Sequence, residues 1–515
     1  MLYSFRSIAE RETKSIPMEK LNLETLKSHL WESANILRGA IDSSDYKNYI
    51  FGLLFLKRLS DVFDEEVEKL IKQGVSKKIA LEDQDEHEFF VSPKAHWSHL
   101  TSLTHNLGDA INKADDLLEE HNRVLEGVLS ATDFNDKDRL PDSTLSKLIV
   151  HFSKIRLRNA DLSEPDILGR AYEYLIAQFA DDAGKKGGEF YTPKEVVTLL
   201  VEILDPQEGM YVCDPACGSG GMLVQAVHHL QSLRQNAKNV VLHGQERNIG
   251  TWAICKMNML LHGIAGARIE KGDTIREPKL LQKGKLLEYD IVIANPPFSL
   301  KNWGVESAEN DSFGRFKYGL PPQSYGDFAF VQHMIATLKP SGRAGIVLPH
   351  GVLFRGGAEG KIRQGILEED LVEAVIGLPS NLFYGASIPA CLFIVNKKKP
   401  AQRKGKVFFL YGAKDFLQLK NQNRLRQEDL DKIVKAYRSY VTTEKYCRPA
   451  SLDEIRSNDY NLNIPRYIDI TEDEAPIDVQ QTINELAKLK KERAAAEEKV
   501  EGYLKELGYK VGASQ

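Results

Sequence analysis

The stretch Tyr289-Asp-Ile-Val-Ile-Ala-Asn-Pro-Pro-Phe298 joins a short apolar run to an asparagine and two prolines. Residues 289–294 predict a strand buried in a sheet, because short apolar runs that end in turn residues are typical of such strands. Proline fixes φ and has no N–H group, so the two prolines stiffen the segment after the strand and leave its carbonyl groups available. A pair of prolines can also simply close a turn.

Asn295 and Pro296 together suit the binding of a planar amine. The side-chain oxygen of Asn295 and the carbonyl of Pro296 can accept both amine hydrogens, which frees the nitrogen lone pair from the conjugated ring. The chemistry that fits is methylation of that nitrogen. A second motif upstream favours this hypothesis over an ordinary turn.

That second motif is the glycine-rich string Asp214-Pro-Ala-Cys-Gly-Ser-Gly-Gly-Met222. It follows a predicted strand at 210–213 and precedes a predicted helix at 222–233. Strand, glycine turn and helix form the context of a nucleoside-binding loop. Glycines let the backbone approach a ligand closely, and Asp214 has the charge to pair with an ammonium group. A glycine turn can also only pack a helix on a sheet, but the longer string is more specific.

The two motifs resemble the S-adenosylmethionine loop and the catalytic loop of amino-methyltransferases that act on adenine in DNA. Over nearly its whole length the chain resembles the modification (methylase) subunit of type I restriction–modification systems. Further strings that carry the resemblance are Gly188-Glu-Phe-Tyr-Thr-Pro193, Gly244-Gln-Glu246, Gly272-Asp-Thr274, Gly326-Asp-Phe-Ala-Phe330 and Tyr49-Ile-Phe-Gly-Leu-Leu-Phe-Leu-Lys-Arg58. The resemblance implies methylation of adenine N6 with S-adenosyl-L-methionine, on a base turned out of the duplex.

The resemblance also implies which residues hold the cofactor. Asp214 would bind its amino group, Glu246 its ribose hydroxyls and Asp273 the exocyclic amine of its adenine. From the residues alone, Glu246 could instead cap the next helix and Asp273 could be a turn residue. The other implied cofactor-binding residues are Glu189, Phe190, Tyr191, Thr192, Pro193, Ala216, Gly218, Ser219 and Gly220.

A target-base site is implied beside the cofactor. Its catalytic loop would consist of Asn295, Pro296, Pro297 and Phe298, with Phe298 and Phe383 stacking on the extruded adenine. Tyr384 is an alternative to Phe383, which could also be a core residue. A polar insert follows at 299–323, and such long loops beside catalytic motifs are usually functional or disordered. Its mixture of basic and aromatic residues predicts DNA contacts by Arg315 and Lys317, with a solvated loop as the alternative.

Composition bounds the function without deciding it. The 515 residues predict two or three domains, and the net charge of −5 is low for a protein that grips DNA alone, so we expect a partner to provide the main DNA contacts. No apolar run is long enough for a membrane span, and the start lacks the apolar core of a signal peptide. Five scattered cysteines suit the cytoplasm. We expect no metal, and ATP-driven activity would belong to another subunit.

The expected fold class is α/β: a Rossmann-like methyltransferase sheet, mostly parallel, with an N-terminal all-α domain and a C-terminal helical tail. The resemblance adds a reversed strand near the end of the sheet, which suits the late strands 390–396 and 407–410. The expected divisions are a flexible tail 1–17 (Met18 is an alternative start), a helical domain 18–160, a catalytic domain 161–447, a linker 448–477 and a docking helix 478–515. Expected helices include 23–37, 45–70, 105–118, 145–152 and 166–179, and expected strands begin near 210, 240, 268, 289, 343 and 371.

The C-terminal helix carries a broken apolar stripe made of Ile483, Leu486, Leu489, Val500, Leu504 and Leu507. Isolated helices are marginally stable, which favours a helix docked on a partner over a solvated one. The resemblance implies that this partner is the specificity subunit, with two copies of the chain per specificity subunit and a restriction subunit in the full complex. An amino-methyltransferase acting on protein glutamine or RNA, and a catalytically inactive scaffold, are the alternative hypotheses.

Overall fold

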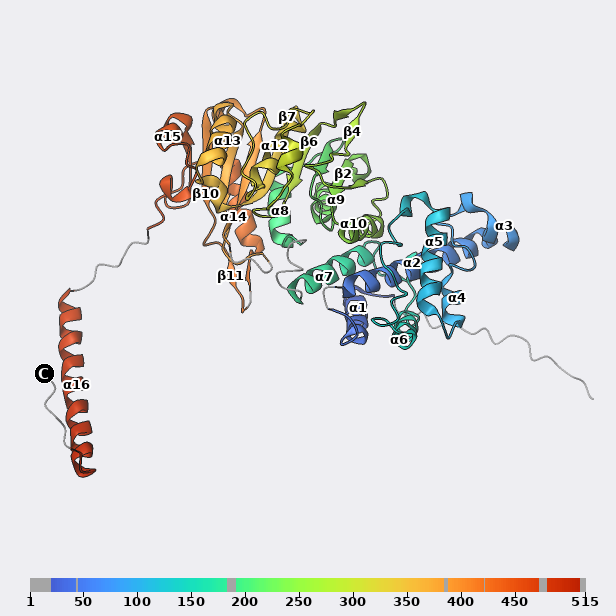
Figure 1. The fold of residues 1–515 in the computed structure, drawn as a ribbon, viewed down its shortest axis with the longest axis horizontal. Coiled ribbons are helices and arrows are strands. Elements are labelled where there is room, and N and C mark those ends of the chain that lie inside the picture. The colour runs from blue at the N-terminus through green and yellow to red at the C-terminus, as the bar shows by residue number, and fades with distance from the viewer. Residues whose placement is uncertain are drawn as a thin grey trace, which may run out of the picture. The chain divides into compact units, whose positions relative to one another are not determined.

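The computed structural model describes residues 20–42, 45–182, 191–383, 388–420, 422–471 and 479–509. The expected tail 1–17 and the glycine-rich segment 184–188 lie outside the described residues. The chain divides into two compact units, residues 1–468 and residues 469–515. Figure 1 shows the first unit as a helical part followed by a part built around one sheet.

The first part is helical, as its apolar periodicity predicts. Its helices are α1 (Leu23–Leu37), α2 (Tyr46–Lys72), α3 (Lys77–Glu82), α4 (Trp97–Ser102), α5 (Leu107–His121) and α6 (Asp142–Phe152). In α1 the buried positions Leu26, Leu30, Ala34 and Leu37 recur every three or four residues, so one face of this helix is packed into the core. The four helices expected in this region are confirmed.

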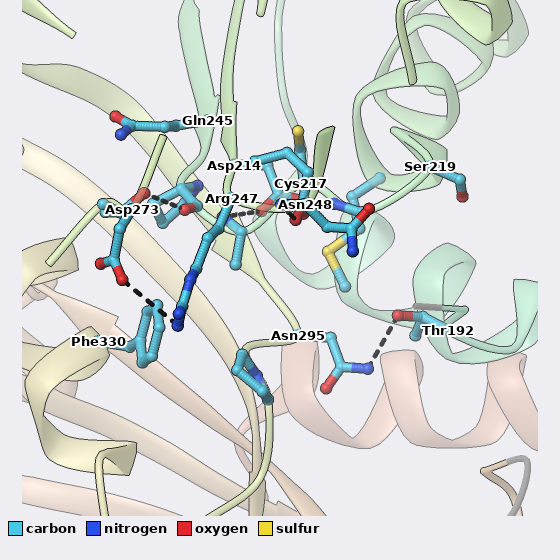
Figure 2. Close-up of a pocket in the computed structure, with 18 of the residues that line it drawn as sticks. Thr192, Asp214, Cys217, Ser219, Gln245, Arg247, Asn248, Asp273, Asn295 and Phe330 are labelled. Carbon is cyan, nitrogen blue, oxygen red and sulfur yellow. Dashed lines mark hydrogen bonds and ion pairs between the residues drawn. The ribbon is translucent and has the colours of Figure 1, made fainter. Parts of the chain in front are cut away.

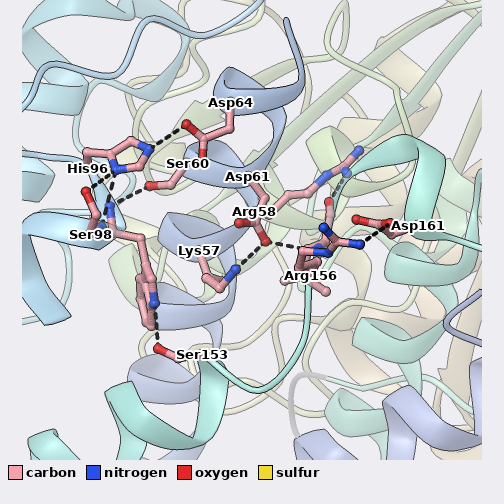
Figure 3. Close-up of polar contacts among 12 residues, drawn as sticks. Lys57, Arg58, Ser60, Asp61, Asp64, His96, Ser98, Ser153, Arg156 and Asp161 are labelled. Carbon is pink, nitrogen blue, oxygen red and sulfur yellow. Dashed lines mark hydrogen bonds and ion pairs between the residues drawn. The ribbon is translucent and has the colours of Figure 1, made fainter. Parts of the chain in front are cut away.

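Buried polar contacts fasten α2 to the rest of the helical part (Figure 3). Lys57 pairs with Asp61 one turn later on α2, and the Asp61 carboxylate also accepts a hydrogen bond from the Leu157 backbone N–H at 2.7 Å. The Trp97 indole donates to Ser153 Oγ at 2.9 Å. Because buried charges need partners, the bond to Leu157 fixes α2 against the segment that follows α6, while the Trp97 bond joins the start of α4 to the end of α6.

The second part is built on a nine-stranded sheet with the order β13-β10-β8-β9-β7-β6-β1-β2-β3. Its strands are β1 (Tyr211–Asp214), β2 (Val241–Glu246), β3 (Arg268–Lys271), β6 (Tyr289–Ala294), β7 (Leu338–Pro349), β8 (Val372–Gly377), β9 (Ala390–Asn396), β10 (Lys406–Tyr411) and β13 (Cys447–Ser451). Two short hairpins, β4–β5 (Leu281–Gln282, Lys285–Leu286) and β11–β12 (Leu417–Gln418, Asn423–Arg424), lie outside this sheet.

Most neighbouring strands are parallel, which confirms the expected sheet. β1 pairs in parallel with β2 and β6, and β6 with β7. β9 runs antiparallel to both of its neighbours, β7 and β8, and is the reversed strand expected near the end. Of the two late strands only β9 is reversed, because β10 pairs in parallel with β8.

Helices cover the sheet. Every residue of β8 and β9 is buried, so both faces of the sheet are covered there. α8 (Lys194–Leu204) packs on α9 (Gly221–Ser232) and α14 (Gln427–Ser439), while α10 (Ile249–Leu261) packs on β2 and β3. The remaining helices of this part are α11 (Val305–Ala308), α12 (Asp327–Ala336), α13 (Gly357–Glu368) and α15 (Leu452–Ser457).

The helix α7 (Ile167–Asp182) joins the helical part to the sheet. It packs on α1, α2 and α10, and the buried Tyr172 hydroxyl donates to the Ile254 carbonyl at 3.1 Å. Just before α7, the Asp166 carboxylate lies 2.6 Å from His262 Nδ1 at the end of α10. One hydrophobic core therefore runs through both parts.

The sheet-bearing part extends beyond the boundary expected at 447. β13 pairs antiparallel with β10, and Leu462, Ile464 and Tyr467 are buried. The Tyr467 ring stacks on Phe409 of β10 with the centroids 3.9 Å apart. Residues 448–468, expected as a linker, therefore belong to the first compact unit.

The second unit is the single helix α16 (Val479–Glu506), close to the range expected for the docking helix. Its apolar stripe is open to solvent, with Ile483, Leu486 and Leu489 each at least half exposed. Across the residues that the structure describes, no helix has the length and apolar content needed to cross a membrane.

Candidate active site

A cavity of about 760 Å³ lies at the carboxyl edge of the sheet, where β1, β2, β3 and β6 end (Figure 2). In parallel sheets this edge is where ligands bind, because the loops that follow the strands meet there. The residues that line it include Tyr191, Thr192, Asp214, Ala216, Gly218, Ser219, Glu246, Arg247, Asp273, Asn295, Pro297 and Phe330. Segments far apart in the sequence thus form one concave site.

Asp214 ends β1 and is almost completely buried. Its Oδ1 accepts a hydrogen bond from the Ala216 backbone N–H at 3.0 Å. Burial raises the pKa of Asp214 to about 8, and the nearby Glu246 carboxylate adds to the rise. A buried acid of this kind gains most from a cationic ligand, because an opposite charge stabilises its ionised form.

Glu246 ends β2 and binds two backbone segments at once. Its Oε2 accepts from the Gly218 N–H at 3.0 Å, and its Oε1 accepts from the Asn248 N–H at 2.8 Å. Burial raises its pKa. A carboxylate has four acceptor positions, so Glu246 keeps capacity for two ligand hydroxyls while it holds the glycine loop and the start of α10 in place.

Asp273 follows β3 and forms a turn as well as lining the cavity. Its Oδ1 accepts from the backbone N–H groups of Ile275 and Arg276, each at 3.0 Å. Its Oδ2 lies 3.0 Å from Arg276 Nη1 and 3.6 Å from Arg247 Nη1. The position of Asp273 is therefore compatible with both expected roles, as a turn residue and as an acceptor for the amine of the cofactor's adenine.

The glycine loop requires glycine at Gly220. Its φ is +83°, in the left-handed region, and a Cβ there would lie 2.6 Å from Met259 Cε and 2.8 Å from Cys255 Sγ. By contrast, a Cβ at Gly221 would meet nothing within 4 Å. The loop thus turns tightly onto α10 before α9 begins, which leaves Gly218 and Ser219 at the cavity wall.

Asn295 lies directly after β6 with its amide group turned toward the cavity (Figure 2). Its Nδ2 donates to Thr192 Oγ1 at 2.9 Å. Its Oδ1 is buried and has no hydrogen-bond partner among the described residues. A buried acceptor without a donor is unfavourable, so this oxygen is prepared for a ligand N–H.

The loop after Asn295 is held by a residue for which the sequence predicted no role. Ser299 adopts φ +51°, and its N–H donates to Asp327 Oδ1 at 2.9 Å. Asp327 is 1% exposed, and its Oδ2 lies 2.9 Å from Arg355 Nη2. Asp327 belongs to the string 326–330 that carries the family resemblance. Its place in that string is the only feature of the sequence that could have indicated a role for it.

The two candidate stacking residues contact each other. The Phe298 and Phe383 rings lie edge to face, with centroids 5.7 Å apart and an interplanar angle of 70°. Phe298 is half-buried, whereas Phe383 is 6% exposed. Phe383 therefore has the environment of a core residue here, and Tyr384 lies outside the described residues.

Most of the predicted cofactor residues meet at the cavity. Tyr191 and Thr192 line it, whereas Pro193 lines an adjacent groove, and Glu189 and Phe190 lie outside the described residues. Pro297 lines the cavity, whereas Pro296 is buried and is not among the lining residues. The sequence predicts no role for several further lining residues, namely Gln245, Arg247, Asn248, Ile249, Leu300, Trp303 and Phe330.

The structure corrects one predicted DNA contact and leaves the other open. Arg315 is 3% exposed, pairs with Asp311 at 2.8 Å and donates to the carbonyls of Thr274 and Ile275. Its guanidinium is a structural cross-link that cannot reach a phosphate, contrary to the prediction. Lys317 is exposed and pairs with Glu369, so its predicted contact stays a prediction.

Two sets of possible metal ligands occur among the described residues, and neither lines the cavity. They are His29, Glu32 and His151 in the helical part, and Asp166, His228 and His262 beside α7. The His29 and His151 rings stack with centroids 3.8 Å apart, and Asp166 already contacts both of its histidines. The side chains of each set lie close together because they contact one another, so we assign no metal to either set.

The fold and the cavity define a methyltransferase of the nucleoside-cofactor type. A family model described as N-6 DNA Methylase matches residues 163–475, and one described as HsdM N-terminal domain matches residues 26–152. The chain belongs to the N-6 DNA methylase family, as a modification subunit of the type I restriction–modification class.

Individual relatives agree with this assignment. The chain is 33% identical to the type I restriction enzyme MjaVII methylase subunit of Methanocaldococcus jannaschii, over 98% of this chain and 86% of that protein. It is 34% identical to the type I restriction enzyme HindI methylase subunit of Haemophilus influenzae, over 78% of this chain and 92% of that protein. The crystal structure of a type I methyltransferase subunit from Streptococcus thermophilus is 34% identical, covers 87% of this chain and 100% of that one, and superposes with a TM-score of 0.76.

Proposed function

We propose that this chain transfers a methyl group from S-adenosyl-L-methionine to N6 of adenine in DNA, as the modification subunit of a type I restriction–modification complex. The observation that carries the proposal is the unpartnered, buried Oδ1 of Asn295 at the wall of the cavity. Family membership supports DNA as the substrate. Nothing in the comparisons favours protein glutamine, RNA or an inactive scaffold.

The cavity residues fit the cofactor's three polar regions. Asp214 offers a buried carboxylate to its ammonium group, Glu246 offers acceptors to its ribose hydroxyls, and Asp273 offers an acceptor to its adenine amine. When bound, S-adenosylmethionine supplies the methyl group on a sulfonium centre. The resemblance to the family implies these roles, and the carboxylates that line the cavity support them.

The catalytic loop prepares the target nitrogen. Asn295 Oδ1 accepts one amine hydrogen and the Pro296 carbonyl accepts the other, which directs the nitrogen lone pair toward the methyl group. Both acceptors stabilise the positive charge that develops on nitrogen, because they are already oriented before the reaction. Thr192 holds the Asn295 amide so that the oxygen, and not the NH₂ group, faces the amine.

The proposed partners are DNA, a specificity subunit that selects the sequence, and a restriction subunit, with two copies of this chain per specificity subunit and a place in the cytoplasm. The exposed apolar residues of α16 support docking on another subunit's helices, because helices in proteins gain most of their stability by packing an apolar face. The net charge of −5 also supports a partner that carries the main DNA contacts.

Methyl transfer by Asn295→Ala tests the proposal. The chain is purified with the specificity subunit encoded beside it, and transfer of labelled methyl groups to DNA is measured. We expect the variant to lose transfer by roughly 100-fold or more while cofactor affinity stays within about twofold. Transfer close to the wild-type rate would refute the role of Asn295, and labelling of protein or RNA instead of adenine would refute the substrate.

A further inference from the structure

The hairpin β11–β12 presents exposed leucines beside the proposed active site. Leu417 and Leu419 are 44% and 47% exposed. Leu417 pairs with Arg424 across the hairpin, and the Leu419 N–H donates to the Gln422 carbonyl at 3.2 Å. Figure 1 shows this hairpin projecting away from the sheet. The two leucines therefore lie at the described part of this projecting hairpin.

The hairpin is anchored to the segment that carries Phe383. The Asn423 side chain donates to the Ser380 carbonyl at 2.9 Å, and the Asn423 N–H donates to the Asn381 carbonyl at 2.9 Å. Phe383 in turn contacts Phe298 of the catalytic loop. Two hydrogen bonds and one ring contact thus connect the hairpin, through the segment 380–383, to the loop that we propose binds the target adenine.

Leu419 also faces a groove that adjoins the cofactor cavity. The groove, of about 510 Å³, shares Tyr191 and Thr192 with the cavity, and Thr192 bonds to Asn295. Four basic residues line it, namely Lys27, Arg170, Lys194 and Arg424, together with two acidic ones, Glu173 and Glu195. Each of the four cations pairs with a carboxylate: Lys27 with Glu24, Arg170 with Glu164, Lys194 with Glu173 and Arg424 with Glu195. Ion pairs that are open to solvent are weak, so the phosphates of DNA can take the place of these carboxylates.

An exposed leucine flanked by cations suits insertion into DNA at the place that an extruded base leaves. When a base leaves the duplex, the gap in the stack is filled by water or by a protein side chain, and proteins that distort DNA often insert an apolar wedge. Single exposed leucines are common on surfaces and usually mean nothing. Leu419 differs because it lies on an anchored hairpin, beside a basic groove, next to the loop that receives the base.

We propose that Leu419 enters the DNA stack and occupies the place that the target adenine leaves. The hairpin acts as a wedge that stabilises the extruded base, while Lys27, Arg170, Lys194 and Arg424 contact the phosphates on either side. This inference rests on the proposed function, because it assumes that the extruded adenine reaches Asn295. Leu419 is a positioning residue, since it contacts the duplex and not the reacting nitrogen.

The test compares Leu419→Ala with Leu233→Ala in the full chain purified with its specificity subunit. Leu233, at the end of α9, is 45% exposed and does not line the groove, so it is a matched control. Each protein methylates two duplexes of one sequence: one with a normal target pair, and one in which the target adenine faces an abasic position. An adenine without a paired base leaves the stack more easily and needs no wedge.

We expect Leu419→Ala to lower kcat/KM on the normal duplex by roughly tenfold or more, and to come within about threefold of wild type on the abasic duplex. When 2-aminopurine replaces the target adenine, its fluorescence rises as it leaves the stack. We expect this rise to be smaller with Leu419→Ala than with wild type on the normal duplex, and equal on the abasic duplex. Leu419→Met and Leu233→Ala should match wild type. Equal losses on both duplexes, or no loss on either, would overturn the wedge. A wild-type complex that methylates neither duplex would instead overturn the proposed function.

Discussion

Asn295 and Thr192 are joined by a hydrogen bond of 2.9 Å between the asparagine Nδ2 and the threonine Oγ1, although they lie 103 residues apart in the sequence. The bond occupies the donor side of the amide and leaves Oδ1 without a partner among the described residues. Thr192 lies just before α8, so the segment that leads into this helix sets the orientation of the residue that follows β6.

Removal of the Thr192 hydroxyl should impair chemistry more than cofactor binding. We expect Thr192→Val to lower kcat by roughly tenfold, because the Asn295 amide loses a bond worth about 1 kcal/mol and can rotate. Thr192→Ser keeps the hydroxyl and should stay within about threefold. Steady-state methylation together with titration of the cofactor checks both. If both variants lose activity equally, the methyl group of Thr192 and not its hydroxyl is what matters.

Cofactor affinity should rise with pH because of Asp214. The pKa of this buried acid is about 8 without ligand, so at lower pH it is mostly protonated and cannot pair with an ammonium group. We expect the apparent Kd for S-adenosylmethionine to fall about fifteenfold between about pH 6 and about pH 7.5, a range in which most of the ligand's amine stays protonated. Calorimetric titration at several pH values measures this slope.

Asp214→Asn provides the control for that slope. The amide does not titrate, so the variant should bind the cofactor weakly with an affinity that hardly changes over the same pH range. A variant that keeps the wild-type slope would show that another group, such as Glu246, controls binding.

Gly220 and Gly221 should respond oppositely to alanine. Gly220→Ala should lower the free energy of unfolding by about 2 kcal/mol or more, because the left-handed φ is strained for alanine and the new Cβ collides with Met259 and Cys255. Gly221→Ala should change it by less than about 1 kcal/mol, toward greater stability, since Gly221 begins α9 and a Cβ there meets nothing. Denaturant unfolding without cofactor measures both. Equal effects would exclude a special role for Gly220.

Local chemistry explains why much of the fold was predictable. The strand 289–294 and the glycine string 214–222 carry their own turn signals, so the strand ends and the loop after β1 could be predicted from a few neighbouring residues. The helices α1, α2, α5 and α6 followed from apolar periodicity. Each of these signals lies within one element and needs no knowledge of what packs on it.

What the sequence did not predict depends on distant partners. β13 contains Pro449 and Arg448 and reads as a linker, and it is a strand only because β10 offers an open edge. Arg315 lies in a polar loop, and nothing local indicates that Asp311 and two carbonyls of the 273–276 turn would surround it. The bond between Asn295 and Thr192, and the support of Ser299 by Asp327, join segments whose proximity only the sheet creates.

Arg315 should matter for stability, in contrast to Lys317. Arg315→Ala leaves the buried Asp311 carboxylate unpaired and should lower the free energy of unfolding by about 3–5 kcal/mol. Lys317→Ala removes an exposed ion pair and should change it by less than about 0.5 kcal/mol. Thermal unfolding of both variants decides this. An Arg315→Ala protein as stable as wild type, but weaker in binding DNA, would restore the phosphate contact that the structure argues against.

The helix α16 should govern assembly and leave the catalytic unit intact. Leu486 lies on the apolar stripe and is 52% exposed, and Lys488 lies two positions later on a different face of the helix. We expect Leu486→Asp to weaken association with the specificity subunit by about tenfold or more, because a charge would be buried in the contact. Lys488→Asp adds the same carboxylate on the other face and should associate normally.

Unfolding temperature and cofactor affinity should match wild type in both variants, because residues 469–515 form a separate compact unit. Co-purification and sedimentation of the mixed subunits measure association, and methylation of DNA by the mixture should fall with it. If Leu486→Asp instead lowers cofactor affinity while assembly is unchanged, α16 serves the catalytic unit itself. If Lys488→Asp disrupts assembly as strongly as Leu486→Asp, the charge of α16 and not its apolar stripe determines docking.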